Sequence, residues 1–251
     1  MPRPLSAIIL AVWLALVPGC GPGREKIVEI PAIDLLLASE VMGRCVEAYE
    51  NCASYRDSGV MTRTFRTANE TQEESQTFST AFQRPDRFRF QCQEGEHRYI
   101  VYADAGTIRA WWGHQEGAQP MPSLDDAIGR AVGPSNGASH TIPRLLMPDR
   151  VHGRSLAELH GLSRLSDALL EDVPCYRING SLRTGALYTV WIDRATFLVR
   201  RIDAEHIAPD YSTTDCTVYF PELNPELADQ ELLLNAPASK PSGRALTARG
   251  E

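Results

Sequence analysis

The stretch QRPDRFRFQC, residues 83–92, contains three arginines and two phenylalanines in ten positions. Basic and aromatic residues that alternate in this way also occur on surfaces that bind nucleic acid, where rings stack on bases and cations meet phosphates. In a β-strand, however, successive side chains point to opposite faces, so that Phe88 and Phe90 lie on one face and Arg87 and Arg89 on the other. A nucleic-acid platform needs rings and cations on the same exposed face. The alternation therefore predicts a strand with one buried aromatic face and one solvated basic face.

Further segments of this kind lie on both sides of the opening stretch. They are rich in β-branched and aromatic residues, and Gly, Pro or Asp marks most of their boundaries, as hairpin turns require. Their short connections predict antiparallel neighbours. The expected strands are residues 58–67, 74–82, 86–93, 97–104 and 107–113, and then 165–171, 174–182, 186–193, 197–205 and 212–220.

Three segments have helical spacing. Residues 34–52 place apolar side chains at helical intervals, with Asp34 as the expected cap. Residues 123–132 begin with Ser123 as the expected N-cap and Asp126 three residues later, close to a capping box. A short apolar helix is expected over 141–147. The order of elements predicts a mainly β (α+β) domain in which both strand sets form one curved antiparallel sheet, covered on one face by helices.

The N-terminus carries an export signal. Residues 5–17 are continuously apolar and follow one positive charge, which fits a signal peptide and is too short to span a membrane. The sequence VPGC at 17–20 resembles a bacterial lipobox, whose cysteine becomes the acylated N-terminus after cleavage. This predicts a signal peptide over 1–19, lipid attachment at Cys20 and a flexible tether over 20–33. The alternative is an ordinary secretory signal with Cys20 as an incidental thiol; both interpretations export the protein.

The charge and the cysteines limit the partners and the chemistry. The formal net charge of −7 works against a polyanionic partner, so no nucleic-acid binding is expected. In an oxidising compartment some cysteines should pair. Without Cys20 the number is odd, so at least one stays unpaired, and the sequence leaves the pairing open among the remaining five. These are Cys45, Cys52, Cys92, Cys175 and Cys216.

Several motifs of catalysis and cofactor binding are missing. The sequence contains no HExxH, Walker loop, CxxC or glycine-rich dinucleotide fingerprint. We therefore expect no enzyme, no catalytic residues, no cofactor and no metal. The C-terminal residues 236–251 are polar and rich in Pro and Ser, and are expected to be disordered.

The chain resembles a known family in the order of its elements and in several motifs. These are Arg84-Pro85 leading into the aromatic strand, the apolar crossover IGRAVGPSNGASHTIPRLLM (128–147), and CYRINGSL with ALYTVWIDRATFLVRRI (175–202). The ending YFPELNPELADQELL is also similar to that of the family. Over residues 34–235 the chain looks like the LolA/LolB-like outer-membrane lipoprotein carrier superfamily.

The resemblance implies an incomplete antiparallel β-barrel with a helical lid over an apolar cavity for acyl chains. It also implies that a strand arginine contacts the lid and controls its opening, which assigns the role of lid latch to Arg84. Alternation on the strands and the apolar crossover supply the candidate cavity residues. They are Phe78, Phe82, Phe88, Phe90, Ile108, Trp112, Leu145, Leu146, Leu187 and Trp191.

The expected function is that of an exported lipoprotein that binds lipid acyl chains, lipoproteins or another hydrophobic ligand. The expected location is the cell envelope, anchored by lipid to a membrane that faces the periplasm, with the outer membrane favoured. The alternative is a sensor, regulatory or structural interaction protein of the envelope with a filled core, a protein partner and no transported ligand.

Overall fold

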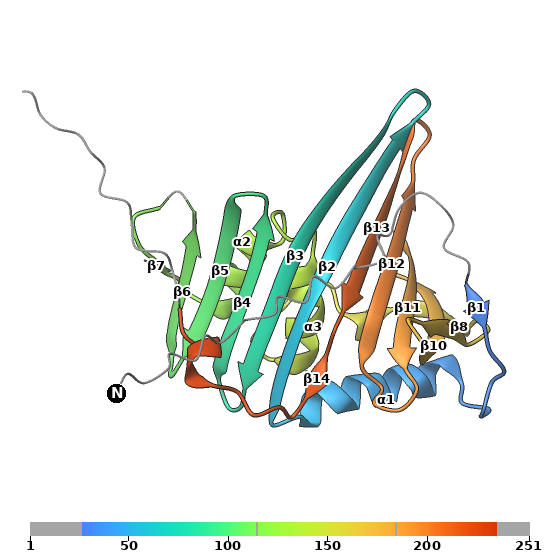
Figure 1. Ribbon diagram of the computed structural model, residues 1–251, viewed down its shortest axis with the longest axis horizontal. Coiled ribbons are helices and arrows are strands. Elements are labelled where there is room, and N and C mark those ends of the chain that lie inside the picture. The colour runs from blue at the N-terminus through green and yellow to red at the C-terminus, as the bar shows by residue number, and fades with distance from the viewer. Residues whose placement is uncertain (1–26, 114, 184, 235–251) are drawn as a thin grey trace, which may run out of the picture.

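The computed structural model describes residues 27–113, 115–183 and 185–234. In this part of the chain, fourteen strands form one antiparallel sheet, in the order β1-β9-β10-β11-β12-β13-β2-β3-β4-β5-β6-β7, with β14 paired to β2 and β8 to β10. The two ends of this order do not pair with each other, so the sheet is open. The expected class, a strongly curved antiparallel sheet with helices, is confirmed, and Figure 1 shows the long central strands.

The strands fall into two sets, one on each side of the helical crossover. The first set consists of β1 (Val28–Glu29), β2 (Ser54–Thr67), β3 (Thr71–Gln83), β4 (Arg87–Glu94), β5 (His97–Asp104), β6 (Thr107–Trp112) and β7 (Gln119–Pro120). The second consists of β8 (His160–Arg164), β9 (Ala168–Leu170), β10 (Val173–Ser181), β11 (Leu187–Asp193), β12 (Val199–Ile207), β13 (Tyr211–Tyr219) and β14 (Glu222–Leu223). The described helices are α1 (Ala38–Asn51), α2 (Leu124–Ala131) and α3 (Ala138–Leu146), with short 3-10 turns η1 (Leu156–Glu158) and η2 (Asp229–Glu231).

The opening stretch forms β4 with the predicted alternation. Phe88 and Phe90 are fully buried on the concave face of the sheet, whereas Arg87 and Arg89 are only partly buried. Arg87 forms ion pairs with Asp104 and Asp229 on the other face. The aromatic half of the stretch is therefore core, and part of its basic half is already neutralised by carboxylates.

The helix starts are partly as expected. Ser123 caps α2, because its hydroxyl oxygen accepts a hydrogen bond from the Asp126 amide at 3.0 Å. The expected cap at Asp34 is wrong: α1 begins at Ala38, and the Glu40 side chain accepts from the Leu37 amide at its start. The Asp34 carboxylate instead accepts from Arg164 and Tyr176.

Four of the described strands, β1, β7, β8 and β14, were not expected from the sequence. Strand β8 lies outside the predicted elements, where exposed polar residues hide the strand pattern. Strand β1 lies inside the predicted tether and pairs with β9, so that from Val28 onward the chain is attached to the sheet edge. The signal peptide (1–19), the first part of the tether (20–26) and the tail (236–251) lie outside the described residues.

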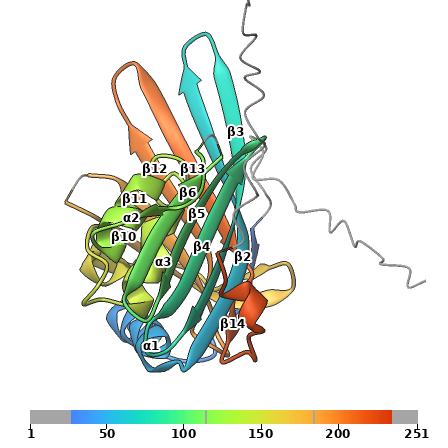
Figure 2. The same cartoon turned by 90° about the vertical axis from the view of Figure 1, so that its left-hand side faces the viewer.

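The core lies between the sheet and the helices. Helices α2 and α3 pack on the concave face of the sheet, and α1 crosses one end of it (Figures 1 and 2). None of the described helices is long and apolar enough to span a bilayer.

Gly59 marks the closest approach inside this core, and replacing it tests the packing. A Cβ atom at Gly59 would lie 2.2 Å from the Phe78 ring and 2.4 Å from the Val218 carbonyl oxygen. We expect Gly59→Ala to lower the free energy of unfolding by about 1–3 kcal/mol, because the strands cannot separate without losing hydrogen bonds.

The matched control is Gly43→Ala on the exposed side of α1, where an added Cβ meets nothing within 4 Å. This change should stabilise the protein by about 0.5–1 kcal/mol through helix propensity. Urea unfolding of both variants measures the difference, and equal stabilities would contradict the close packing at Gly59.

Candidate functional site

The structure gathers most of the predicted cavity residues on the concave face of the sheet. Eight of the ten belong to one core or pack against it. Phe78, Phe82, Phe88, Phe90, Leu145 and Leu146 are buried there, and Ile108 and Trp112 are partly buried at its margin. Of these eight residues, Trp112 lines one of the two cavities described below, and the other seven belong to the core or pack against it.

Leu187 and Trp191 are not in this group. They point to the convex face, because Tyr188, Val190 and Ile192 occupy the inward positions of β11. Trp191 packs instead in a small separate cluster with Cys175, and its indole NH donates to Asp203 at 2.9 Å. The expected inner-face position of these two residues is therefore wrong by one residue of register, and a one-residue shift exchanges the faces of a strand.

Helices α2 and α3, residues 124–146, form a lid that contacts the sheet mainly through hydrocarbon. Ile128, Ile142 and Leu146 are almost completely buried between helices and sheet. The hydrogen bonds across this interface include one from the Tyr99 hydroxyl to the Ala127 carbonyl at 3.2 Å, and a weak one from the Asn136 amide to the Met61 sulfur at 3.5 Å. Apolar contact therefore dominates the attachment of the lid.

Cavities lie on two sides of this lid. One of about 470 Å³ lies between strands β4–β6 and the end of α2, and is lined by Cys92, the stacked pair Tyr99 and Trp112, and Arg130. A second, of about 210 Å³, lies between α3 and strands β11–β13, where Tyr188 and Tyr219 contribute to its wall. The first of these is within the usual size range of small-molecule sites.

Arg84 joins the lid to α1. Its guanidinium donates to the carbonyl oxygens of Cys52 at 2.7 Å and Tyr49 at 3.2 Å, at the end of α1, and to that of Leu146 at 3.3 Å, at the end of α3. The last carbonyls of a helix have no partner within the helix, and a cation near them is favourable. The contact between Arg84 and the helical segment, expected from the family resemblance, is present in the structure.

A buried carboxylate lies on the same concave face. Asp57 accepts a hydrogen bond from the Tyr55 hydroxyl at 2.8 Å, whereas its Oδ1 atom has no partner. Burial raises the pKa of Asp57 to about 6, and Tyr55 and the neighbouring Thr80 lower it by less. Thr80 lies opposite Asp57 in the sheet, and hydrogen bonding from its side chain and backbone lowers the pKa of Asp57. The sequence did not single out Asp57, because nothing in its local pattern separates a buried carboxylate from a surface one.

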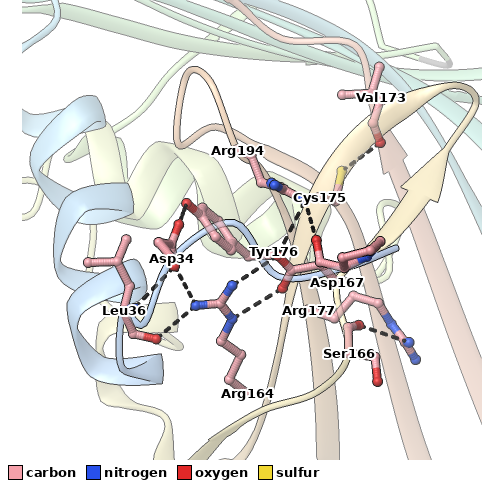
Figure 3. A network of polar contacts seen from close by, with 11 residues as sticks. Asp34, Leu36, Arg164, Ser166, Asp167, Val173, Cys175, Tyr176, Arg177 and Arg194 are labelled. Atoms are coloured by element: carbon pink, nitrogen blue, oxygen red, sulfur yellow. Dashed lines mark hydrogen bonds and ion pairs between the residues drawn. The ribbon is translucent and has the colours of Figure 1, made fainter. Parts of the chain in front are cut away.

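A polar network fixes the N-terminal segment to the second strand set (Figure 3). Arg164 donates to Asp34 at 2.7 Å and to Asp167 at 2.9 Å, and Tyr176 donates to Asp34 at 2.6 Å. The hydrogen bonds from Tyr176 and Arg164 lower the pKa of Asp34 to about 2. Asp167 is fully buried, and Arg194 lies 3.5 Å from its carboxylate.

The remaining chemistry-bearing residues show no reactive arrangement. Among the residues that the structure describes, no group of three or more His, Cys, Asp or Glu side chains is placed to hold a metal ion. Cys45, Cys52, Cys92 and Cys175 are buried free thiols, and burial raises the pKa of Cys45 and of Cys92 to about 12. These thiols are core residues of low nucleophilicity. Cys20 lies outside the described residues.

The chain was compared with known proteins. No family model matches it, and no curated protein does. Solved structures that are similar include lipoprotein LppX of Mycobacterium tuberculosis, with 9% identity, 76% of this chain and 97% of that chain covered, and a TM-score of 0.44. A LolA superfamily protein from Nitrosomonas europaea has 9% identity, with 80% and 99% covered and a TM-score of 0.33. A third similar structure is the MucA/MucB complex of Pseudomonas aeruginosa, with 11% identity and a TM-score of 0.37. The match covers 78% of this chain and 60% of that chain.

The perturbed pKa of Asp57 predicts an unusual pH dependence of stability. Because this pKa is about 6 in the folded chain and 3.8 in its ordinary state, stability is lost as the pH rises from about 4 to about 6. Asp57→Asn keeps an acceptor for Tyr55 and removes the charge. We expect it to match the wild type at pH 4 and to exceed it by about 3 kcal/mol at pH 7, at 1.36 kcal/mol per unit.

Asp34→Asn is the matched control with the opposite sign. The pKa of Asp34 is lowered, so its stabilisation is present above pH 4 and is lost as the pH falls toward 2. This variant should be less stable than the wild type at pH 7. Urea unfolding between pH 3 and pH 8 measures both, and a constant difference between Asp57→Asn and the wild type would contradict a buried, titrating Asp57.

Proposed function

We propose that this protein is an exported, membrane-anchored lipoprotein that binds a hydrophobic ligand, an acyl chain of a lipid or of a lipoprotein, between its curved sheet and its helical lid. One observation carries the proposal: the lid is attached to the sheet mainly by apolar contact and is flanked by cavities of about 470 and 210 Å³. The proposed role is binding and not catalysis, with no cofactor or metal.

An acyl chain can replace the lid's contacts at little cost. A hydrocarbon chain that enters between Phe90 and Ile142 exchanges apolar contact for apolar contact, and its own removal from water contributes about 25 cal/mol per Å². Few polar groups lose partners in this exchange, because few hydrogen bonds cross the interface. An interface rich in such bonds would oppose opening by about 1–3 kcal/mol for each group left unsatisfied.

The contacts of Arg84 support its proposed role as the lid latch. Its side chain bonds the ends of both α1 and α3. Arg84 is an exposed residue, so it can release the Leu146 carbonyl to solvent without leaving a buried charge. The latch therefore adds to the stability of the closed lid without preventing its opening.

The proposed anchor shapes the biological role. A lipidated Cys20 holds the protein at a membrane of the cell envelope, facing the periplasm, and we favour the outer membrane. A tethered protein does not diffuse between membranes, so we propose an acceptor or a resident lipid-binding protein and not a shuttle.

The alternative is an interaction protein whose core is permanently filled. It draws on the complete burial of Phe82, Phe88 and Phe90, which leaves no space between these rings and the lid in the closed form. Such a protein would bind an envelope protein through its surface and would carry no lipid.

Native mass spectrometry of the mature protein, purified from membranes, separates the two functions. The binding function predicts co-purifying acyl ligand that leaves when the lid opens. A ligand-free protein in a stable complex with a protein partner would refute it.

The latch predicts a specific effect of Arg84→Leu. Charged hydrogen bonds are worth about 1.5–3 kcal/mol, so losing the bond to Leu146 should speed ligand release by roughly tenfold or more. The fold should persist, because the bonded carbonyls become hydrated. Release of a fluorescent fatty acid to acceptor vesicles measures the rate.

The matched control is Arg87→Leu, which removes a nearby arginine whose ion pairs lie on the convex face. It should leave ligand release unchanged. Equal release from the wild type and Arg84→Leu would reduce Arg84 to a surface charge.

The anchor predicts that radioactive palmitate labels the wild-type protein in cells and does not label Cys20→Ala. The other described cysteines with free thiols are buried and serve as internal controls. Label that persists in the variant would place the acylation elsewhere, and absence of label from the wild type would leave an ordinary secretory signal.

A further inference from the structure

The segment between β1 and α1 exposes an unusual amount of apolar surface. Ile33, Leu35 and Leu37 are 72%, 97% and 65% exposed. We call these three residues the N-terminal apolar patch. Ile27 and Val28, just before it, are also largely exposed. Single exposed apolar residues are common, but a run of them in one short segment marks an interaction site.

The patch is held in place by polar contacts. Asp34 and Leu36, which alternate with the patch residues, face inward: both accept hydrogen bonds from Arg164, through the carboxylate and the backbone carbonyl respectively (Figure 3). The Ile30 amide donates to the Asp167 carbonyl at 2.9 Å, and Arg194 donates to the Pro31 carbonyl at 3.3 Å. The outward direction of the apolar side chains is thus set by a fixed backbone.

The contacts of the network explain why the patch stays exposed. The buried side of the segment is occupied by the Asp34 carboxylate, which pairs with Arg164, and by the Leu36 side chain, which packs against the core. The apolar side chains of the patch therefore cannot turn inward without breaking these contacts. Removing one partner from such a pair is costly. The segment is therefore fixed with its apolar side outward, in a folded chain that offers no cover for it among the described residues.

We propose that the N-terminal apolar patch inserts into the surface of the lipid bilayer that holds the protein. This rests on the proposed lipid anchor. Cys20 precedes Ile27 by seven residues, and seven extended residues span at most about 25 Å. The acylated cysteine therefore keeps this end of the sheet close to the membrane. At this short distance from the membrane, the apolar side chains of the patch can bury their surface in the boundary between lipid headgroups and acyl chains.

The insertion orients the domain. The acyl chains at Cys20 and the patch are two attachments to the membrane. Together they fix one end of the sheet against it, and this end carries β1, β9 and the start of α1. In Figure 1 this is the edge at which β1 and the first turn of α1 lie, away from β6 and β7.

An environment-sensitive fluorophore tests the insertion. The purified, lipidated protein with Leu35→Cys is labelled with NBD, since the four free thiols of the described chain are buried and unreactive. It is reconstituted into vesicles of phosphatidylethanolamine and phosphatidylglycerol. We expect a blue shift of the NBD emission and its loss when doxyl-labelled lipid is included. The matched control is Asn69→Cys, at the exposed turn between β2 and β3, which should show neither change.

Each outcome decides the proposal. A blue-shifted label that doxyl lipid does not quench places the patch against protein, either a second copy or another part of this chain, and overturns it. A label with the emission of an aqueous environment also overturns it. The result does not depend on whether an acyl ligand is bound between the sheet and the lid. A protein without such a ligand still shows insertion if the proposal is right. Quenching at position 35 without palmitate at Cys20 supports insertion and refutes only the anchor.

Removing the patch gives a second measurement. A triple variant should move between vesicles faster than the wild-type lipidated protein, by on the order of tenfold; it combines Ile33→Ser, Leu35→Ser and Leu37→Ser. The reason is that its membrane affinity then comes from the acyl chains alone, without the apolar contact of the patch. The control combines Leu187→Ser, Ile207→Ser and Leu223→Ser, which removes exposed apolar side chains elsewhere on the sheet. Equal transfer rates for the two variants would overturn the proposal.

Discussion

The pairing of β2 with β13 is the interaction on which the structure depends. It joins residues 59–67 to residues 211–219 across most of the sequence and makes one sheet of the two strand sets. A bidentate ion pair between Arg63 and Asp215, directly opposite each other, supports the register, with Nε–Oδ1 at 2.6 Å. At the end of the same pairing, Gly59 admits the Phe78 ring and the Val218 carbonyl into space that a side chain would fill.

This pairing also decides where the helices go. Once β13 lies beside β2, the crossover that connects β7 to β8 has to return along the sheet from one edge to the other. Its apolar side chains, such as Ile128 and Leu145, find cover only on the concave face. The lid is thus a consequence of the sheet order, and Arg84 is placed between α1 and α3 because β3 ends where both helices end.

The sequence contains most of the information on local structure. Alternation predicts β4 correctly, and Ser123 with Asp126 predicts the start of α2, because both depend on neighbouring residues alone. The predicted inward direction of Leu187 and Trp191 is wrong, because both alternating sets of side chains in β11 contain apolar residues. Only the contacts of the folded sheet determine which set faces inward. Asp34 looked like a helix cap because a cap and an ion-pair partner have the same local sequence. Its true partner, Arg164, lies 130 residues away.

Asp57 lowers the stability of the closed form at neutral pH, and the proposed binding function requires the lid to open. Its carboxylate is buried next to Tyr55 with one oxygen unsatisfied, so ionising it in the closed form is costly at neutral pH. Any movement of the lid that admits water to Asp57 recovers part of this cost, whereas the apolar contacts of the lid favour closure. A core selected only for stability would carry an apolar or amide side chain here, because an uncharged group of similar size avoids the penalty. The carboxylate therefore makes the closed form less stable at neutral pH, and under the proposed function a bound acyl chain would supply the apolar contact that the open lid gives up.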